Sequence, residues 1–440
     1  MKKFLSVILA LVMVLSFVAC TDEGTDPVVT DPVATETPTE APDETEAPDE
    51  TEAPTEAPDE PSGMVQGVTD TEVLVGNVAG TSGALAAVGV PFNAGIKAYF
   101  DMVNDAGGVA GRQIRFIHQD DESDPAKAKA AIQTLVEDEK IFAIVGHFGT
   151  PSIQATLDDV KDYGLPVVYF ASGVNTLFNE EAEGSDKNIF PVQPILITEG
   201  QIMIARAVAD FGAESVGVIY TNDDAGKDMV NGAESMGERL GINVVTEQVT
   251  AGATDVSAAV TAVLSANPDV IIAATIQPTL PAIVKGLVAQ GNDVPVITSY
   301  NNVDGEIASQ IYADVAGSFD VYGNGWLDVF QEEAAEDTAN FATWIGEDFA
   351  TSAFAMAGWI AGQTFTAGLE AVGDAELTWD SYINALDQEQ VKIPWGGYVD
   401  FRDGRRVGVD SMNMSRLADE SSWEPVQPLM SIEEILEGAE

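Results

Sequence analysis

Between Thr71 and Tyr300 the sequence alternates repeatedly between short apolar runs and longer amphipathic stretches. The apolar runs have the length of strands, and the amphipathic stretches, such as residues 91–108, have the length and apolar spacing of helices. Because the apolar runs are nearly continuous, they indicate parallel strands that are buried on both faces of a sheet. The strands predicted in this way are EVLVGNVAG, QIRFIHQD, FAIVGH, PVVYFAS, VGVIY, NVVTEQV, DVIIAAT and VPVITSY.

The alternation is interrupted once, and this interruption predicts two lobes. It stops near Pro194 and then restarts, which indicates two separate α/β units with parallel sheets covered on both faces. A chain of 440 residues is also too long for one simple core and suits two lobes.

After about Tyr322 the pattern becomes mostly helical as far as Ala385. The segments GGYVDF and RRVGVDSMNMS then flank residues 403–404, an Asp-Gly pair, which predicts a hairpin. The aromatic residues expected in the core of this part are Trp344, Phe354 and Trp359, and packing is also expected for Trp326 and Trp395.

The N-terminus has the three parts of an export signal. Lys2 and Lys3 precede an apolar stretch over residues 4–19, which is shorter than the ~20 residues of a membrane span. The stretch ends in LSFVAC, which resembles a lipobox, although Phe17 stands where that motif prefers Leu. We therefore expect a signal peptide over residues 1–19 and lipidation of Cys20, with fatty-acyl chains such as palmitate holding the chain to the outer face of the cell membrane.

The segment that follows Cys20 is acidic and rich in proline. Residues 21–62 carry 15 acidic and no basic side chains, so residues 20–63 are expected to form a disordered tether. The whole chain has a formal charge of −53, which argues against nucleic acid as a partner and against adhesion to anionic lipid. Any membrane attachment is therefore expected to come from the lipid alone.

Residues for catalysis or metal binding are scarce. The chain has one cysteine, Cys20, and two histidines, His118 and His147, both expected to be structural. GTSGALAAVG does not fit the G-x-G-x-x-G fingerprint of a dinucleotide-binding enzyme, and DDESDP is interpreted as a loop that leads into an N-cap at Asp124. We expect no enzymatic activity, no metal and no cofactor.

Several ordered segments resemble the type I periplasmic binding proteins, specifically the leucine/isoleucine/valine-binding family of ABC importers in its lipoprotein form. The longest is GTSGALAAVGVPFNAGIKAYFDMVNDAGGVAGRQIRFIHQDDESDP, and the others are FAIVGHFGTPSIQA, LPVVYFASG, VGVIYTNDDAGKDM and DVIIAATIQPTLPAIVKGLVAQG. The resemblance implies two Rossmann-like lobes joined by three hinge crossovers, here near Gln193, near Gly323 and over 404–409. It places lobe 1 at 71–193 plus 323–405 and lobe 2 at 194–322 plus 406–440. It also implies a monomer that closes over a small solute and delivers it to the permease subunits of the importer.

The resemblance carries ligand-binding roles to specific positions. Thr150 falls where the family holds a ligand carboxylate, and the Thr150-Pro151 pair itself predicts a helix N-cap, where anions are favoured. Ala171, Ser172 and Gly173 form the loop that gives the family a carbonyl for the ligand ammonium and an N–H for its carboxylate. The loop at Ser82 contributes to the cleft wall.

The ammonium half of the family site departs from the pattern. Ala225 replaces a tyrosine, with Asp223 and Asp224 beside it, and the acidic partner of the ammonium falls at Tyr300 or Asn301. A branched-chain amino acid is therefore the leading ligand, and a urea, a short amide or a carboxylic acid without an amine stays open. A sensory solute receptor of the same fold is the alternative to an importer subunit.

Overall fold

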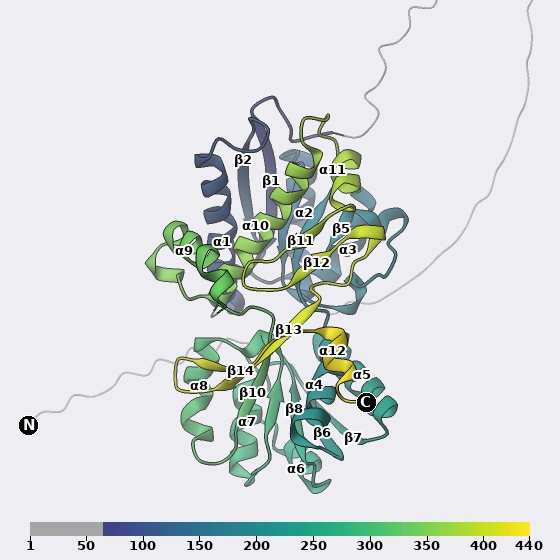
Figure 1. Cartoon of the computed structure of the whole chain (residues 1–440), viewed down its shortest axis with the longest axis vertical. Helices are drawn as coiled ribbons and strands as arrows, with labels where there is room; N and C mark the ends of the chain where they lie inside the picture. The colour runs from purple at the N-terminus through teal and green to yellow at the C-terminus, as the bar shows by residue number, and fades with distance from the viewer. Residues whose placement is uncertain (1–64, 330) are drawn as a thin grey trace, which may run out of the picture. The chain divides into compact units, whose positions relative to one another are not determined.

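The computed structural model describes residues 65–329 and 331–440, so the predicted signal peptide, Cys20 and the tether lie outside the described residues. A first sheet has five parallel strands in the order β2-β1-β3-β4-β5 (Figure 1). These strands are β1 (Glu72–Ala79), β2 (Gln113–Asp120), β3 (Ala143–Phe148), β4 (Val167–Ala171) and β5 (Ile189–Phe190).

A second sheet has seven strands in the order β14-β13-β10-β9-β8-β6-β7. Five of them are parallel, and β13 and β14 run antiparallel at one edge. These strands are β6 (Ser215–Thr221), β7 (Asn243–Val249), β8 (Val270–Ala274), β9 (Val296–Thr298), β10 (Val321–Gly325), β13 (Ser411–Leu417) and β14 (Trp423–Ser431). The prediction of two α/β lobes built on parallel strands is confirmed, whereas the antiparallel edge was not predicted.

Helices belong to each lobe. The first lobe has α1 (Ala86–Asp105), α2 (Pro125–Gln133), α3 (Thr150–Tyr163), α9 (Ala335–Ile345), α10 (Ala353–Val372) and α11 (Trp379–Leu386). The second lobe has α4 (Leu196–Phe211), α5 (Asp224–Leu240), α6 (Ser257–Ser265), α7 (Leu280–Ala289), α8 (Gly305–Val315) and α12 (Ile432–Glu437). No helix of the described part of the chain is long and apolar enough to cross a membrane.

Two helix starts show how local sequence sets the elements. The Asp124 side chain accepts hydrogen bonds from the N–H groups of Ala126 and Lys127, so the predicted N-cap of α2 is confirmed. The predicted N-cap at Thr150 is wrong by one residue, because Gly149, at φ 88°, ends the strand-to-helix turn and Thr150 is already helical. The Thr150 hydroxyl therefore does not cap the helix and can bond to another group.

Two other boundaries differ from the sequence prediction. Helix α1 begins at Ala86 and contains Pro91, whereas the amphipathic pattern placed its start at Pro91. The hairpin expected around 403–404 is reduced to one antiparallel bridge between Val399 and Val409, because most of its two sides pair elsewhere. Strand β12 (Tyr398–Asp400) pairs with β11 (Gln390–Lys392), and β13 pairs with β10 and β14. Sheet partners distant in sequence therefore prevail over the local turn signal.

Helix α10 lies against α1, and close backbone contact holds the two together. A Cβ on Gly358 would lie 1.9 Å from the Phe92 carbonyl, and one on Gly95 would lie 1.9 Å from the Ala355 carbonyl. Only glycine permits this approach. Trp359 is in the core as predicted, Trp344 is only half-buried, and Phe354 faces a cavity instead.

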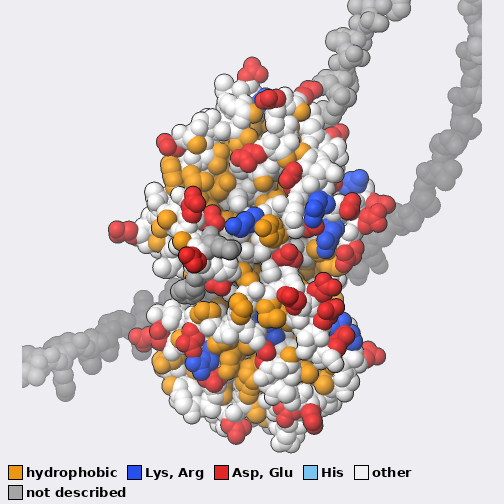
Figure 2. Space-filling view, viewed as in Figure 1, with side chains coloured by type: hydrophobic (Ala, Val, Ile, Leu, Met, Phe, Trp, Pro, Cys, Tyr) orange, Lys and Arg blue, Asp and Glu red, His pale blue; other side chains and the backbone are white. Residues whose placement is uncertain are grey.

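The chain passes between the two sheets three times, after β5, after β10 and after β12 (Figure 1). The exact lobe boundaries stay a prediction. Acidic side chains are spread over both lobes on the face shown in Figure 2, where basic side chains are few.

Candidate functional site

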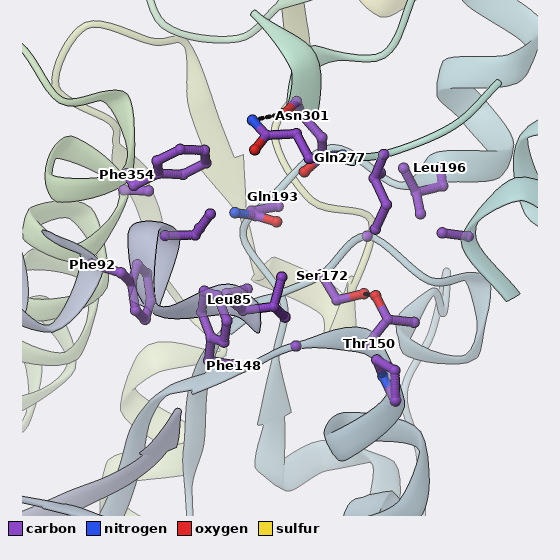
Figure 3. A pocket seen from close by; sticks show the side chains of 18 residues that line it. Leu85, Phe92, Phe148, Thr150, Ser172, Gln193, Leu196, Gln277, Asn301 and Phe354 are labelled. Carbon is purple, nitrogen blue, oxygen red and sulfur yellow. Dashed lines mark hydrogen bonds between the residues drawn. The ribbon is translucent and has the colours of Figure 1, made fainter. Parts of the chain in front are cut away.

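A cavity of about 120 Å³ lies where the two lobes meet (Figure 3). In the first lobe, residues at the ends of β3 and β4 line it; in the second lobe, residues just beyond β8 and β9 do so. Ligands of open α/β sheets bind at the carboxyl ends of parallel strands, so this position suits a binding site.

One end of the cavity is formed by two hydroxyl groups. Thr150 Oγ1 and Ser172 Oγ lie 2.8 Å apart, and both residues line the cavity (Figure 3). Thr150 is the first residue of α3, so its backbone N–H has no acceptor within the helix. Gly173 sits beside them and must be glycine, because a Cβ there would lie 2.1 Å from the Pro194 carbonyl. This end therefore offers hydrogen-bond donors and the positive end of a helix.

The rest of the wall is mainly apolar. Phe92 and Phe148 stand with ring centroids 5.5 Å apart, and Phe354 reaches the cavity from the start of α10 (Figure 3). The other large apolar side chains of the lining are Leu85, Val88, Leu196 and Ile276. This part of the wall therefore offers an apolar surface of the kind that ligand pockets present to the body of a small molecule.

Three amides complete the lining. Gln193, in the first crossover, donates from Nε2 to Tyr169 Oη at 3.0 Å and accepts from Tyr300 Oη at 3.3 Å. Gln277 Nε2 donates to the Asn301 carbonyl at 3.3 Å and to the carboxylate of Asp304. None of the residues that line the cavity is charged.

The predicted site residues divide into two groups. Thr150, Ala171, Ser172, Gly173 and Asn301 line the cavity. The lining excludes four others: Ser82, Asp223, Asp224 and Tyr300. Whether any of the nine contacts a ligand stays a prediction.

Each residue outside the lining has other partners. The Ser82 N–H donates to the Asp120 carboxylate at 3.3 Å. Asp223 caps α5 by accepting the Gly226 N–H at 2.9 Å, while the Asp224 side chain is exposed and lies 3.5 Å from Gln154 Nε2. Tyr300 is buried beside a smaller cavity of about 50 Å³.

That smaller cavity shares part of its wall with the main one. Both are lined by Gln193, Asn301, Phe354 and Ala357, and the smaller one adds Tyr300, Asp304 and Trp326. Trp395 is packed in the core, where its Nε1 donates to Thr338 Oγ1 at 2.8 Å.

The lobes also touch outside the cavity. The Asn175 N–H of the first lobe donates to the Asp228 carboxylate of α5 at 2.7 Å. Burial raises the pKa of Asp228, with the Asn175 hydrogen bond acting against this effect. The two lobes therefore contact each other directly across the cleft.

Both histidines have neutral partners. Buried His147 lies 2.6 Å from Thr156 Oγ1, and its burial lowers its pKa to about 4. His118 lies 2.9 Å from both Thr81 Oγ1 and Asn77 Oδ1, and burial also lowers its pKa. Over residues 65–329 and 331–440, no three His, Cys, Asp or Glu side chains are grouped so that they could hold a metal ion.

A family model described as "Periplasmic binding protein" matches residues 72–421. The chain belongs to this family. Periplasmic binding proteins are extracytoplasmic binding proteins and not enzymes, so the predicted family and the predicted lack of catalysis are both confirmed.

Individual relatives are distant. The "Amino acid binding protein" of Pseudomonas aeruginosa is 24% identical over 54% of this chain, which spans 63% of that relative's length. The "Leu/Ile/Val-binding protein homolog 2" of Brucella abortus is 22% identical over 58% of this chain and 68% of its own.

Solved structures of the same fold differ in what they bind. A branched-chain amino acid ABC transporter protein from Thermus thermophilus with bound valine aligns at a TM-score of 0.71. It is 14% identical and covers 83% of this chain and 97% of its own. A fatty acid ABC transporter substrate-binding protein from Thermomonospora curvata also aligns at a TM-score of 0.71. It is 17% identical, and the alignment covers 84% of this chain and 95% of that protein. At these identities the likeness shows the fold alone.

Proposed function

We propose that this periplasmic binding protein is the lipid-anchored, extracytoplasmic solute-binding subunit of an ABC importer. It captures a small solute between its two lobes by hinge closure and delivers it to the permease subunits. The observation that carries the proposal is the cavity itself, which joins the strand ends of both lobes and combines a donor-rich end with an apolar wall.

The geometry favours a solute with a carboxylate and a compact apolar body. The carboxylate meets the Thr150 and Ser172 hydroxyls at the start of α3, where backbone donors and the helix dipole favour an anion. The apolar body packs on the rings of Phe92, Phe148 and Phe354. A cavity of about 120 Å³ resembles in size the engineered cavity of about 150 Å³ that binds benzene. The names of the relatives agree with this class of solute, because branched-chain amino acids and fatty acids both combine a carboxylate with apolar carbon.

The membrane anchor is proposed from the sequence alone. Cys20 directly follows a 16-residue apolar stretch, where a lipobox places its modified cysteine. Mass spectrometry of membrane fractions is expected to find a lipidated N-terminal Cys20. A free Cys20 thiol, or cleavage at another bond, would contradict the anchor and leave the binding role untouched.

The central experiment replaces Thr150 with valine, which keeps the shape and removes the hydroxyl. Leucine, isoleucine, valine and the amine-free acids 4-methylpentanoate and 3-methylbutanoate are screened by thermal shift, and the responders by calorimetry. A hydrogen bond to a charged group is worth about 1.5–3 kcal/mol, so Thr150→Val is expected to weaken binding tenfold to a hundredfold.

The control is Thr343→Val on the exposed side of α9, where the Ala339 carbonyl is the one partner of the hydroxyl among the described residues. This variant is expected to bind as the unmodified protein does. If Thr150→Val binds equally well, the hydroxyl pair is not at the ligand. If no compound of the panel raises the melting temperature, the proposed class of solute is wrong.

A further inference from the structure

Building on the proposed function, we infer that the solute is a compact carboxylic acid without a charged amine. The lining of the cavity leads to this conclusion, because it presents three amides, two hydroxyls and apolar carbon but no carboxylate. An amino acid would bring an ammonium group into this space without an acidic partner. A buried charge is tolerated only when it is paired and hydrogen-bonded.

Acidic side chains of the second lobe that bond to residues at or beside the lining already have donors of their own. Asp304 accepts the N–H groups of Glu306 and Ile307, at 2.7 and 2.9 Å, together with Gln277 Nε2. Asp304 also faces the smaller cavity rather than the main one. Its carboxylate therefore serves to cap α8 and to hold Gln277.

Glu199 is equally occupied. Its carboxylate accepts from Ser299 Oγ and from the Tyr300 N–H, both at 2.8 Å, and from Asn324 Nδ2 at 3.3 Å. Glu199 is fully buried and is not part of the cavity lining. A ligand ammonium would have to displace these donors to reach it.

The two carboxylates proposed from sequence as substitutes are also engaged away from the cavity. Asp223 accepts from Thr221 Oγ1 at 2.8 Å as well as from the helix N–H that it caps. Asp224 points to solvent near Lys227, 3.9 Å from that ammonium. Neither carboxylate lines the cavity, although their neighbour Ala225 does.

The donor end, in contrast, has a hydrogen to give. The hydroxyls of Thr150 and Ser172 carry two hydrogens, and one of them fills the bond between the two oxygens. The Ser172 oxygen also accepts the Val174 N–H at 3.3 Å. Among the described residues no acceptor takes the second hydrogen, and Ser172 is only 6% exposed. A ligand oxygen at this point satisfies it.

A carboxylate suits this end better than a neutral amide. Both groups accept hydrogen bonds, but the N-terminus of a 14-residue helix adds a preference for negative charge. An amide would also bring N–H groups toward a wall of phenylalanine and leucine side chains. The class inferred is thus a short branched or ring-bearing monocarboxylate.

The test compares molecules that differ only in the amine. Leucine is paired with 4-methylpentanoate, valine with 3-methylbutanoate and phenylalanine with 3-phenylpropanoate, and 4-methylpentanamide is added as the neutral analogue. Binding to the unmodified protein is measured by calorimetry at pH 7. At least one acid is expected to bind roughly a hundredfold more tightly than its amino acid, which corresponds to about 3 kcal/mol.

Asn301→Asp then places a carboxylate in the lining with almost no change in shape. It is expected to shift the ratio of leucine to 4-methylpentanoate affinity toward leucine by roughly tenfold. Asn243→Asp, at the exposed start of β7, adds the same charge away from the cavity and is expected to leave the ratio unchanged. If Asn301→Asp does not fold, the comparison of acids with amino acids on the unmodified protein still tests the inference.

The outcomes separate this inference from the function on which it rests. Equal or tighter binding of the amino acids overturns the inference and leaves the solute-binding role in place. Tighter binding of the amide than of the acid overturns it as well, because the donor end would then not select an anion. Binding of no compound overturns the inference together with the class of solute proposed above.

Discussion

A buried glutamate makes the stability of this protein depend on pH in an unusual direction. Glu199 lies in α4 and is fully buried, with Ser299, Tyr300 and Asn324 as its hydrogen-bond donors. Burial raises the pKa of Glu199 from 4.5 to about 7, and these hydrogen bonds and the charge of Arg206 only partly oppose this effect. Most surface carboxylates stabilise the folded state when ionised, whereas this one stabilises it when protonated.

The magnitude follows from the two pKa values. The folded protein keeps the Glu199 proton up to about pH 7, and the unfolded chain loses it near pH 4.5. Stability from this group is therefore fully present below about pH 4.5 and is lost as the pH rises through about 7. The difference between the two pKa values corresponds to a loss on the order of 3 kcal/mol.

The substitution Glu199→Gln removes the titration and keeps the shape. The amide oxygen can accept from the Tyr300 N–H, and the Ser299 hydroxyl can accept from the new amide nitrogen. Urea unfolding at pH 5 and pH 8 measures the free energy of unfolding of both proteins. Between these pH values the unmodified protein is expected to lose up to about 3 kcal/mol relative to the variant.

The control is Glu238→Gln on the exposed side of α5, which removes the same charge from a site without a side-chain hydrogen bond among the described residues. This variant is expected to follow the unmodified protein at both pH values. Parallel pH profiles for the unmodified protein and Glu199→Gln would refute the reasoning. They would mean that the buried carboxylate titrates alike in the folded and unfolded states.

Two further predictions concern other buried ionisable groups. His147 is held neutral beside Thr156 and has its pKa lowered by burial from 6.5 to about 4, so stability is lost as the pH falls through this range, by on the order of 3 kcal/mol. In urea unfolding, His147→Gln is expected to reduce the loss between pH 7 and pH 4, and an undiminished loss would contradict the assignment. Buried Arg406 pairs with Asp387 at 2.6 Å and donates to the Ile189 carbonyl, so Arg406→Met should cost roughly 3–5 kcal/mol because the carboxylate is left unpaired. Thermal unfolding measures this, and Arg406→Met with Asp387→Leu is expected to recover part of the loss.

The strands of the two lobes could be predicted because burial on both faces leaves a direct trace in the sequence. In β8, VIIAA is buried at every position, and β3 is buried at all six. The strands β13 and β14 leave a weaker trace. β14 is exposed or half-buried along its length, and β13 contains serine, asparagine and methionine. β13 pairs with β10, which lies far from it in sequence, and β14 joins the sheet only through β13.

The candidate site was predicted mainly on the first-lobe side, and Asn301 is the one predicted residue of the second lobe that lines the cavity. Thr150 and Ser172 follow neighbouring strands β3 and β4, so their proximity is a consequence of parallel pairing. Gln277 and Phe354 reach the cavity only because the second lobe and α10 come to it from distant parts of the chain. For Gln277 the sequence offered one signal, its position just beyond the end of a predicted strand of the second lobe. For Phe354 the sequence offered no signal that distinguishes a cavity-lining residue from a core residue.

Two buried arginines tie the crossovers between the lobes to one another. Arg206, in α4, donates to Asn324 at the end of β10, just before the second crossover, and to the carbonyls of Met412 and Asn413 in β13. It therefore fixes the second-lobe ends of all three crossovers to one another. Arg406 donates to carbonyls at Lys187 and Ile189 and so fixes the third crossover to the first on the other side.

Only short segments remain between these two anchors. In the third crossover they are residues 407–411, and in the first they are residues 190–195. The two segments are themselves joined, because the Val409 N–H donates to the Val192 carbonyl at 2.9 Å. Hinge rotation absorbed by a few residues between rigid bodies is the motion by which binding proteins of this kind close. Gln193 lies within this paired segment and also lines the cavity, so under the proposed hinge closure a solute that contacts Gln193 would act directly on the residues that rotate.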